Sequence, residues 1–145
     1  MPISFHHLCT VRLPNRRHLK LFVSQIFTIE NKQLDTLSII FCDDAYLLAI
    51  NQTYLNHDDY TDIITFNLST TNSTPIVGEI YISVERVKEN AELLKVSFTQ
   101  ELHRVIFHGT LHLCGFNDKT KVQKQAMRKM EDKYLALYFN SLKTL

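Results

Sequence analysis

The chain has 145 residues, of which 45% are hydrophobic and 21% charged. This length predicts a single domain, residues 1–145, with a hydrophobic core of its own, and the composition argues against intrinsic disorder. The formal net charge of +1 excludes a protein that is strongly basic overall, so any surface that binds nucleic acid must be local.

Cysteine content and hydropathy bear on where the protein works. Cys9, Cys42 and Cys114 are widely spaced among apolar neighbours, a pattern typical of buried thiols in a reducing compartment. The first 17 residues lack the uninterrupted apolar core of a signal peptide. No window approaches the roughly 18 apolar residues of a transmembrane helix. We therefore expect a cytoplasmic protein without a membrane segment.

The first half of the chain alternates strands and helices. "ISFHHLCTV" (3–11) predicts a strand, and Pro14 is expected to open a helix. "TLSIIFC" (36–42) is β-branched and apolar, which predicts a buried strand. Asp43 or Asp44 can cap the helix that follows, which runs to about residue 54. The apolar residues of the first helix recur at helical spacing and predict one buried stripe: Leu19, Phe22, Val23, Ile26 and Phe27.

The second half begins with two predicted strands, 61–68 and 76–84, which a polar loop (68–75) connects. An amphipathic helix (84–96) follows, with Val84, Val87, Ala91 and Leu94 on one side. Two more helices are expected: one opened by Ser97 with Gln100 and closed near Cys114 by Gly115, and a charged final helix over 122–142. The predicted order of elements is therefore β-α-β-α-β-β-α-α-α. The predicted fold class is α/β (α+β): one small mixed sheet of about four strands packed against about five helices.

The stretch "FHGTLHLCGFNDKT" (107–120) carries the clearest chemistry. His108 and His112 lie four residues apart on the predicted helix, so only about 40° separates them around its axis and both rings can face one ion. Gly115 permits a left-handed turn that brings the chain back, and Asp118 can then offer a carboxylate oxygen. Two imidazoles and one carboxylate suit zinc, with a fourth position left for water, and also suit other divalent metals.

The alternative is that both histidines are ordinary core residues. The rest of this helix is apolar, which predicts burial, and a buried imidazole costs stability unless it has a polar partner. The glycine and the aspartate at suitable spacing favour the metal site. The spacing also overlaps the metzincin protease pattern, but Gly109 stands where those proteases have the glutamate that activates water. The sequence therefore predicts a metal site without peptidase chemistry.

Three blocks stand out along the chain: "YTDIITFN" (60–67), "GEIYIS" (78–83) and "ELHRVIFHGTLHLCGFNDKT" (101–120). They resemble the YbeY family, bacterial endoribonucleases of ribosomal RNA maturation, whose corresponding motifs are T-D-V-L-S-F, G-D-I-x-I-S and H-G-x-L-H-L-x-G-Y-D-H. The similarity spans about residues 40–130. It implies that His108 and His112 are the first two zinc ligands and that Asp118 stands where the third is usually histidine.

The resemblance implies a single-strand-specific, zinc-dependent endoribonuclease that matures the 3′ end of small-subunit ribosomal RNA and serves ribosome quality control. One zinc ion is expected, with His108, His112 and Asp118 acting in catalysis through the metal, and the small ribosomal subunit as partner. Leu55 stands where the family often has an arginine. If that arginine engages phosphate in relatives, the candidates to replace it are Arg12, Arg16, Arg17, Lys20, Lys119 and Lys121.

Two other functions remain open from sequence: a metal-dependent hydrolase of another substrate, and a non-catalytic zinc-containing assembly factor of the ribosome. No general base is evident. Asp62 is interpreted as a turn or capping residue. The remaining histidines are expected to lie outside the site, with His103 about 140° from His108 around the helix axis, His57 in a polar turn, and His6 and His7 in the first strand.

Overall fold

A computed structural model describes residues 2–55, 61–69 and 75–144. In this part of the chain, strands and helices follow one another in the predicted order β-α-β-α-β-β-α-α-α. The elements are β1 (Ile3–His7), α1 (Arg16–Ile29), β2 (Leu34–Cys42), α2 (Asp44–Leu55), β3 (Ile63–Asn67), β4 (Ile76–Ser83), α3 (Val84–Leu94), α4 (Phe98–Leu113) and α5 (Lys121–Leu142).

The four strands form one mixed sheet in the order β1-β2-β4-β3. β2 pairs in parallel with both β1 and β4, whereas β3 runs antiparallel to β4. β2 and β4 lie at the centre and are rich in β-branched residues, which suit strands covered on both faces. β3 is therefore an edge strand, and its register places Ile63 opposite Ile82.

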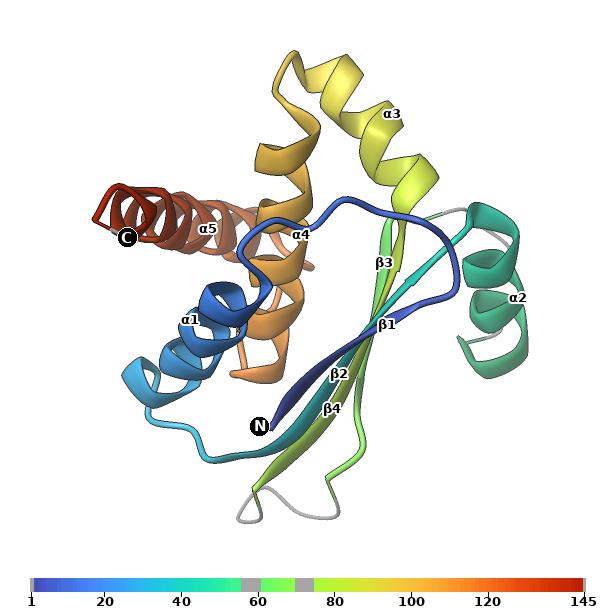
Figure 1. Ribbon diagram of the computed structural model, residues 1–145. Coiled ribbons are helices and arrows are strands. Elements are labelled where there is room, and N and C mark those ends of the chain that lie inside the picture. Colours follow the sequence, from blue (N-terminus) through green and yellow to red (C-terminus); the bar gives the residue numbers. More distant parts are fainter. Residues whose placement is uncertain (1, 56–60, 70–74, 145) are drawn as a thin grey trace.

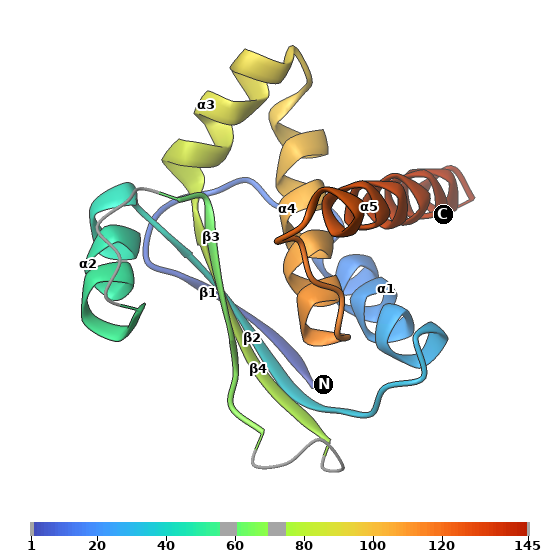
Figure 2. The ribbon, with the colours of Figure 1, turned by 180° about the vertical axis from the view of Figure 1, so that it is seen from behind.

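Helices cover the two faces of the sheet unequally (Figures 1 and 2). α1, α4 and α5 lie on one face, where they enclose the main hydrophobic core, and α2 lies on the other face over a smaller cluster of Cys42, Leu47, Ile50 and Ile64. The predicted stripe of α1 is buried in the main core. α4 is the central helix, since it contacts α1, α3 and α5 as well as β3 and β4.

The close approach of α4 to the sheet depends on Gly109. A Cβ atom at this position would lie 2.9 Å from the side chains of both Ile63 and Ile80, closer than real side chains come. The absent side chain lets the helix backbone rest against β3 and β4. It therefore holds the neighbouring His108 close to the edge strand.

The predicted fold class is confirmed, and some predicted boundaries are wrong. β1 ends at His7 rather than at Val11, with one further ladder bond from Leu8 N–H to the Phe41 carbonyl. α1 begins at Arg16 rather than at Pro14 because Asn15 takes the left-handed conformation, with φ 57°, which helical backbone cannot continue.

α3 also ends earlier than predicted. Val84, Val87 and Ala91 are buried as expected, but Leu94, the last residue of the helix, is 50% exposed, and Lys95 leaves the helix at φ 58°. Most of the predicted polar loop, and His57, lie outside the described residues. Within the described ranges, no helix is both long and apolar enough to cross a membrane.

Candidate metal centre

The end of α4 and the loop after it bring three ligand atoms together. Ser97 opens the helix as predicted, because its Oγ accepts the N–H of Gln100 at 3.0 Å. Beyond Leu113, Gly115 turns the chain back at φ 104°. Oδ2 of Asp118 thereby lies 3.3 Å from Nε2 of His108 and 3.3 Å from Nε2 of His112. The three candidate ligand atoms lie within 4.8 Å of one another.

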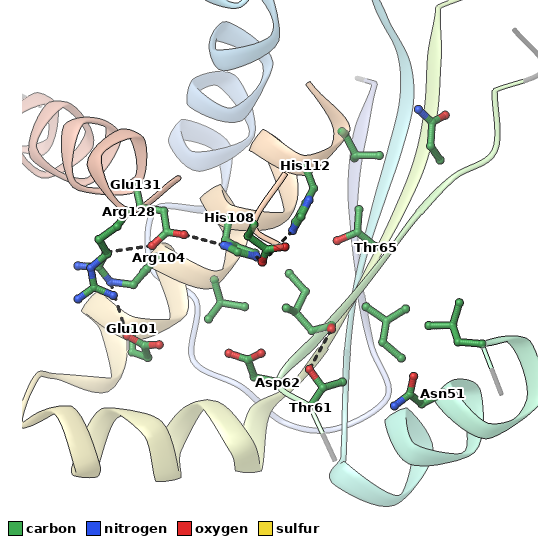
Figure 3. A pocket seen from close by; sticks show the side chains of 17 residues that line it. Asn51, Thr61, Asp62, Thr65, Glu101, Arg104, His108, His112, Arg128 and Glu131 are labelled. Carbon is green, nitrogen blue, oxygen red and sulfur yellow. Dashed lines mark hydrogen bonds and ion pairs between the residues drawn. The ribbon is translucent and has the colours of Figure 1, made fainter. Parts of the chain in front are cut away.

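This centre lies in a cleft of about 870 Å³. One wall is formed by α4 and α5, and the other by β3 and the C-terminal part of α2, so that Thr65 of β3 lies across from His112 (Figure 3). The three side chains are half-buried, with exposed fractions of 21% for His108, 27% for His112 and 36% for Asp118. The protein thus holds them firmly on one side and leaves the other side open to the cleft.

Glu131 of α5 fixes the orientation of His108. Its Oε2 lies 2.6 Å from Nδ1 of His108, and the carboxylate is buried. A carboxylate at Nδ1 keeps the proton on that nitrogen, so Nε2 presents its lone pair to Asp118 and the cleft. Burial lowers the pKa of His108, but the hydrogen bond that His108 donates to Glu131 and the charges of Glu131, Asp118 and Asp62 outweigh it, and the pKa is raised.

Arg104 in turn holds Glu131. Its Nη1 contacts Oε1 of Glu131 at 3.1 Å and Oδ1 of Asp132 at 3.0 Å, and its Nε lies 3.7 Å from Oε1 of Glu101. Burial raises the pKa of Glu101, against the charge of Arg104. A chain of polar contacts thus runs from Arg104 through Glu131 to His108 (Figure 3).

Comparison with known proteins decides the family. The family model described as Endoribonuclease YbeY matches residues 11–138. The chain belongs to the YbeY family. It is 46% identical to the Endoribonuclease YbeY of Flavobacterium psychrophilum, over 94% of this chain and 96% of the relative, and 47% identical to that of Christiangramia forsetii, over 81% and 80%.

A solved structure has the same fold. The solution structure of TM1509 from Thermotoga maritima has a TM-score of 0.65 and 26% sequence identity, with coverage of 97% of this chain and 93% of that one. The YbeY resemblance deduced from the three sequence blocks is therefore confirmed over nearly the whole chain.

Two further acidic residues of this YbeY chain line the cleft beside the centre, although the sequence alone does not assign them to it: Asp62 is interpreted there as a turn or capping residue, and Glu131 has no predicted role. Asp62 lines the cleft, and its carboxylate accepts a hydrogen bond from Asn90 Nδ2 at 3.4 Å. Burial raises its pKa, against the charge of His108. Glu131 did carry a signal, because it lies between Met127 and Tyr134 on the buried face of α5, where an unpartnered carboxylate would be costly.

The other histidines lie outside the centre where the structure describes them. Nδ1 of His103 is 2.6 Å from the Thr99 carbonyl and its ring stacks on Tyr138, which confirms that it does not face the ligands. His6 and His7 lie in β1, at the opposite edge of the sheet from β3.

Proposed function

We propose that this YbeY chain is a metal-dependent endoribonuclease that cuts single-stranded RNA during ribosomal RNA maturation, at the 3′ end of the small-subunit RNA. The proposal includes one zinc ion, with His108, His112 and Asp118 as its ligands. The observation that carries it is the convergence of Asp118 Oδ2 with both histidine Nε2 atoms, at 3.3 Å each, inside a cleft. The relatives that are 46% and 47% identical to this chain are named endoribonucleases.

The donor set fits a divalent ion. Two imidazole nitrogens and one carboxylate oxygen form a common three-ligand set for catalytic zinc, and the open side toward the cleft leaves room for substrate. When bound there, such an ion supplies Lewis acidity, which makes water more acidic and stabilises negative charge on a phosphoryl oxygen.

The chain's own residues prepare this chemistry. Glu131 keeps the Nδ1 proton of His108 in place, and Arg104 keeps Glu131 in place, so the ligand geometry needs little rearrangement when the site is filled. An open three-ligand site also favours catalysis over the alternative of a zinc that is only structural, as an assembly factor would hold.

The test is cleavage of a labelled precursor that carries the 3′ end of small-subunit ribosomal RNA. Protein stripped by a chelator is expected to lose cleavage and to regain it when zinc is added back. Peptide and simple phosphoester substrates, run in parallel, test the alternative of another hydrolase. Zinc-loaded protein that cuts none of these substrates, but still binds the small subunit, would favour the assembly factor instead.

Asp118→His is expected to shift metal selectivity. Carboxylate oxygen suits Mg²⁺ and Mn²⁺ better than imidazole does, whereas imidazole favours zinc. The ratio of zinc affinity to Mn²⁺ affinity should therefore be on the order of tenfold higher in the variant than in the wild type. Competition titrations of the stripped proteins would measure this ratio. An unchanged zinc-to-manganese ratio would show that Asp118 is not a ligand.

A further inference from the structure

Positive charge is concentrated in one short segment of this nearly neutral chain. Residues 119–130 contain five lysines and arginines and no aspartate or glutamate. All five cationic residues are exposed: Lys119, Lys121, Lys124, Arg128 and Lys129. The segment covers the loop that follows the candidate ligand Asp118 and the first half of α5. Although the net charge of the whole chain is only +1, residues 119–130 therefore form a local basic surface next to the metal centre.

Three of these residues share one face of α5. Lys121 and Lys124 lie seven and four residues before Arg128, so all three fall within about 60° of one another around the helix axis and extend about 10 Å along it. Glu131 is only about 60° away from Arg128 around the axis, and it contacts His108. This basic row, Lys121–Lys124–Arg128, therefore leads along α5 toward the candidate ligands.

Two arginines line the cleft, Arg104 and Arg128, and they differ in exposure and in their ion pairs (Figure 3). Arg104 is 11% exposed and contacts Glu101, Glu131 and Asp132. Arg128 is 56% exposed, and its ion pair is a long one with Asp132, 3.9 Å from Nε to an oxygen that already pairs with Arg104 at 3.0 Å. Arg104 is thus committed to the protein interior, whereas the guanidinium of Arg128 keeps donors available to the cleft.

The basic residues of the N-terminal region lie elsewhere. Arg16 contacts His7, and Arg16 and Lys20 both lie over the ring of Phe5 in β1. β1 is the edge strand opposite β3, and neither residue lines the cleft. Compared with Arg16 and Lys20, the row on α5 is therefore better placed to meet a substrate at the candidate ligands, because it includes Arg128, which lines the cleft.

We propose that the basic row Lys121–Lys124–Arg128 binds the phosphate backbone of unpaired RNA, and that Arg128 contacts the phosphate nearest to the metal centre. This inference rests on the proposed function and identifies the surface that guides its substrate. A guanidinium suits phosphate because its planar fork can donate two parallel hydrogen bonds. Contacts to phosphate position the strand without reading its sequence.

The test compares wild type with Arg128→Ala, Arg128→Lys and the control Lys129→Ala. Lys129 is also an exposed cation of α5, but it lies about 100° from Arg128 around the axis and does not line the cleft. Equilibrium binding of a labelled, unstructured RNA oligonucleotide is measured for the stripped proteins across a salt series. KM and kcat for cleavage are measured separately for the zinc-loaded proteins.

Arg128→Ala is expected to weaken RNA binding by about fivefold to tenfold and to raise KM similarly, with kcat and zinc content unchanged. The slope of log affinity against log salt should fall by about 0.7, the value for one lost contact with single-stranded phosphate. Arg128→Lys should bind with intermediate affinity, and Lys129→Ala should match wild type. The triple variant Lys121→Ala/Lys124→Ala/Arg128→Ala should lower the slope by about 2.

Two results would overturn the inference: wild-type affinity and salt slope in Arg128→Ala, or equal losses in Arg128→Ala and Lys129→Ala. Failure of the proposed function gives a different result. In that case wild type would bind RNA through Arg128 but would not cut it with zinc present, which supports the basic row while removing the nuclease proposal.

Discussion

Replacement of His112 by alanine is expected to lower kcat/KM for RNA cleavage by on the order of a hundredfold or more and to weaken zinc binding. The variant keeps the fold, since His112 is 27% exposed at the cleft and its Nε2 faces Asp118 rather than the core. The loss arises because two ligands hold a divalent ion much less firmly than three. Cleavage of the labelled precursor and zinc titration of the stripped protein measure the two effects.

His6→Ala is the matched control, because His6 is an exposed histidine of β1, at the sheet edge opposite β3. It should bind zinc and cut RNA like wild type. Equal cleavage by wild type and His112→Ala would indicate a contaminating nuclease or a centre that does not include His112. Thermal unfolding of both variants establishes that neither effect reflects a lost fold.

Replacement of Glu131 by glutamine is expected to weaken metal binding by about tenfold to a hundredfold. The wild-type carboxylate accepts from His108 with one oxygen and from Arg104 with the other, at 2.6 and 3.1 Å. An amide has only one oxygen, so its NH₂ group must face either the cation of Arg104 or Nδ1 of His108. If it faces Nδ1, the imidazole proton moves to Nε2, and that nitrogen can no longer bind a metal.

Asp132→Asn separates this effect from simple loss of charge. Asp132 also pairs with Arg104, at 3.0 Å, but it is 58% exposed, and its ion pairs are with Arg104 and Arg128. Both variants remove one negative charge beside Arg104, and only Glu131→Gln changes a contact to a candidate ligand. NMR of the imidazole nitrogens would report the tautomer of His108 directly. Similar metal affinities in the two variants would show that Glu131 does not orient His108 for metal binding and has only a structural role.

The fold could be predicted from local patterns because those patterns reflect local physics. Helix α4 begins and ends where Ser97 and Gly115 indicate, since a side-chain cap and a left-handed turn are properties of a few adjacent residues. The choice between Asp43 and Asp44 as the cap of α2 could not be made from sequence. In the structure Oδ1 of Asp43 accepts the N–H of Tyr46 at 2.8 Å, while Asp44 pairs with Arg86 of α3 at 2.7 Å.

The candidate site could be predicted only as far as its residues are close in sequence. The spacing of His108, His112 and Asp118 predicts the cluster, because one helix and one turn bring the three together. Glu131 lies 23 residues beyond His108, and their contact depends on how α5 packs against α4. Asp62 reaches the cleft only through the packing of β3 against α4. Such contacts follow from tertiary packing, which periodicity does not determine.

The candidate centre connects α4, the loop after it and α5. Its ligands come from α4 and the following loop, and the partner of His108 comes from α5. An ion bound there would cross-link α4 to the loop after it and would stabilise the folded state increasingly as the free ion concentration rises above the dissociation constant, because the unfolded chain lacks the site. A shortage of the metal in the cell would then lower the stability of the protein as well as its activity. Because a less stable protein is degraded faster, its abundance would follow the supply of the ion.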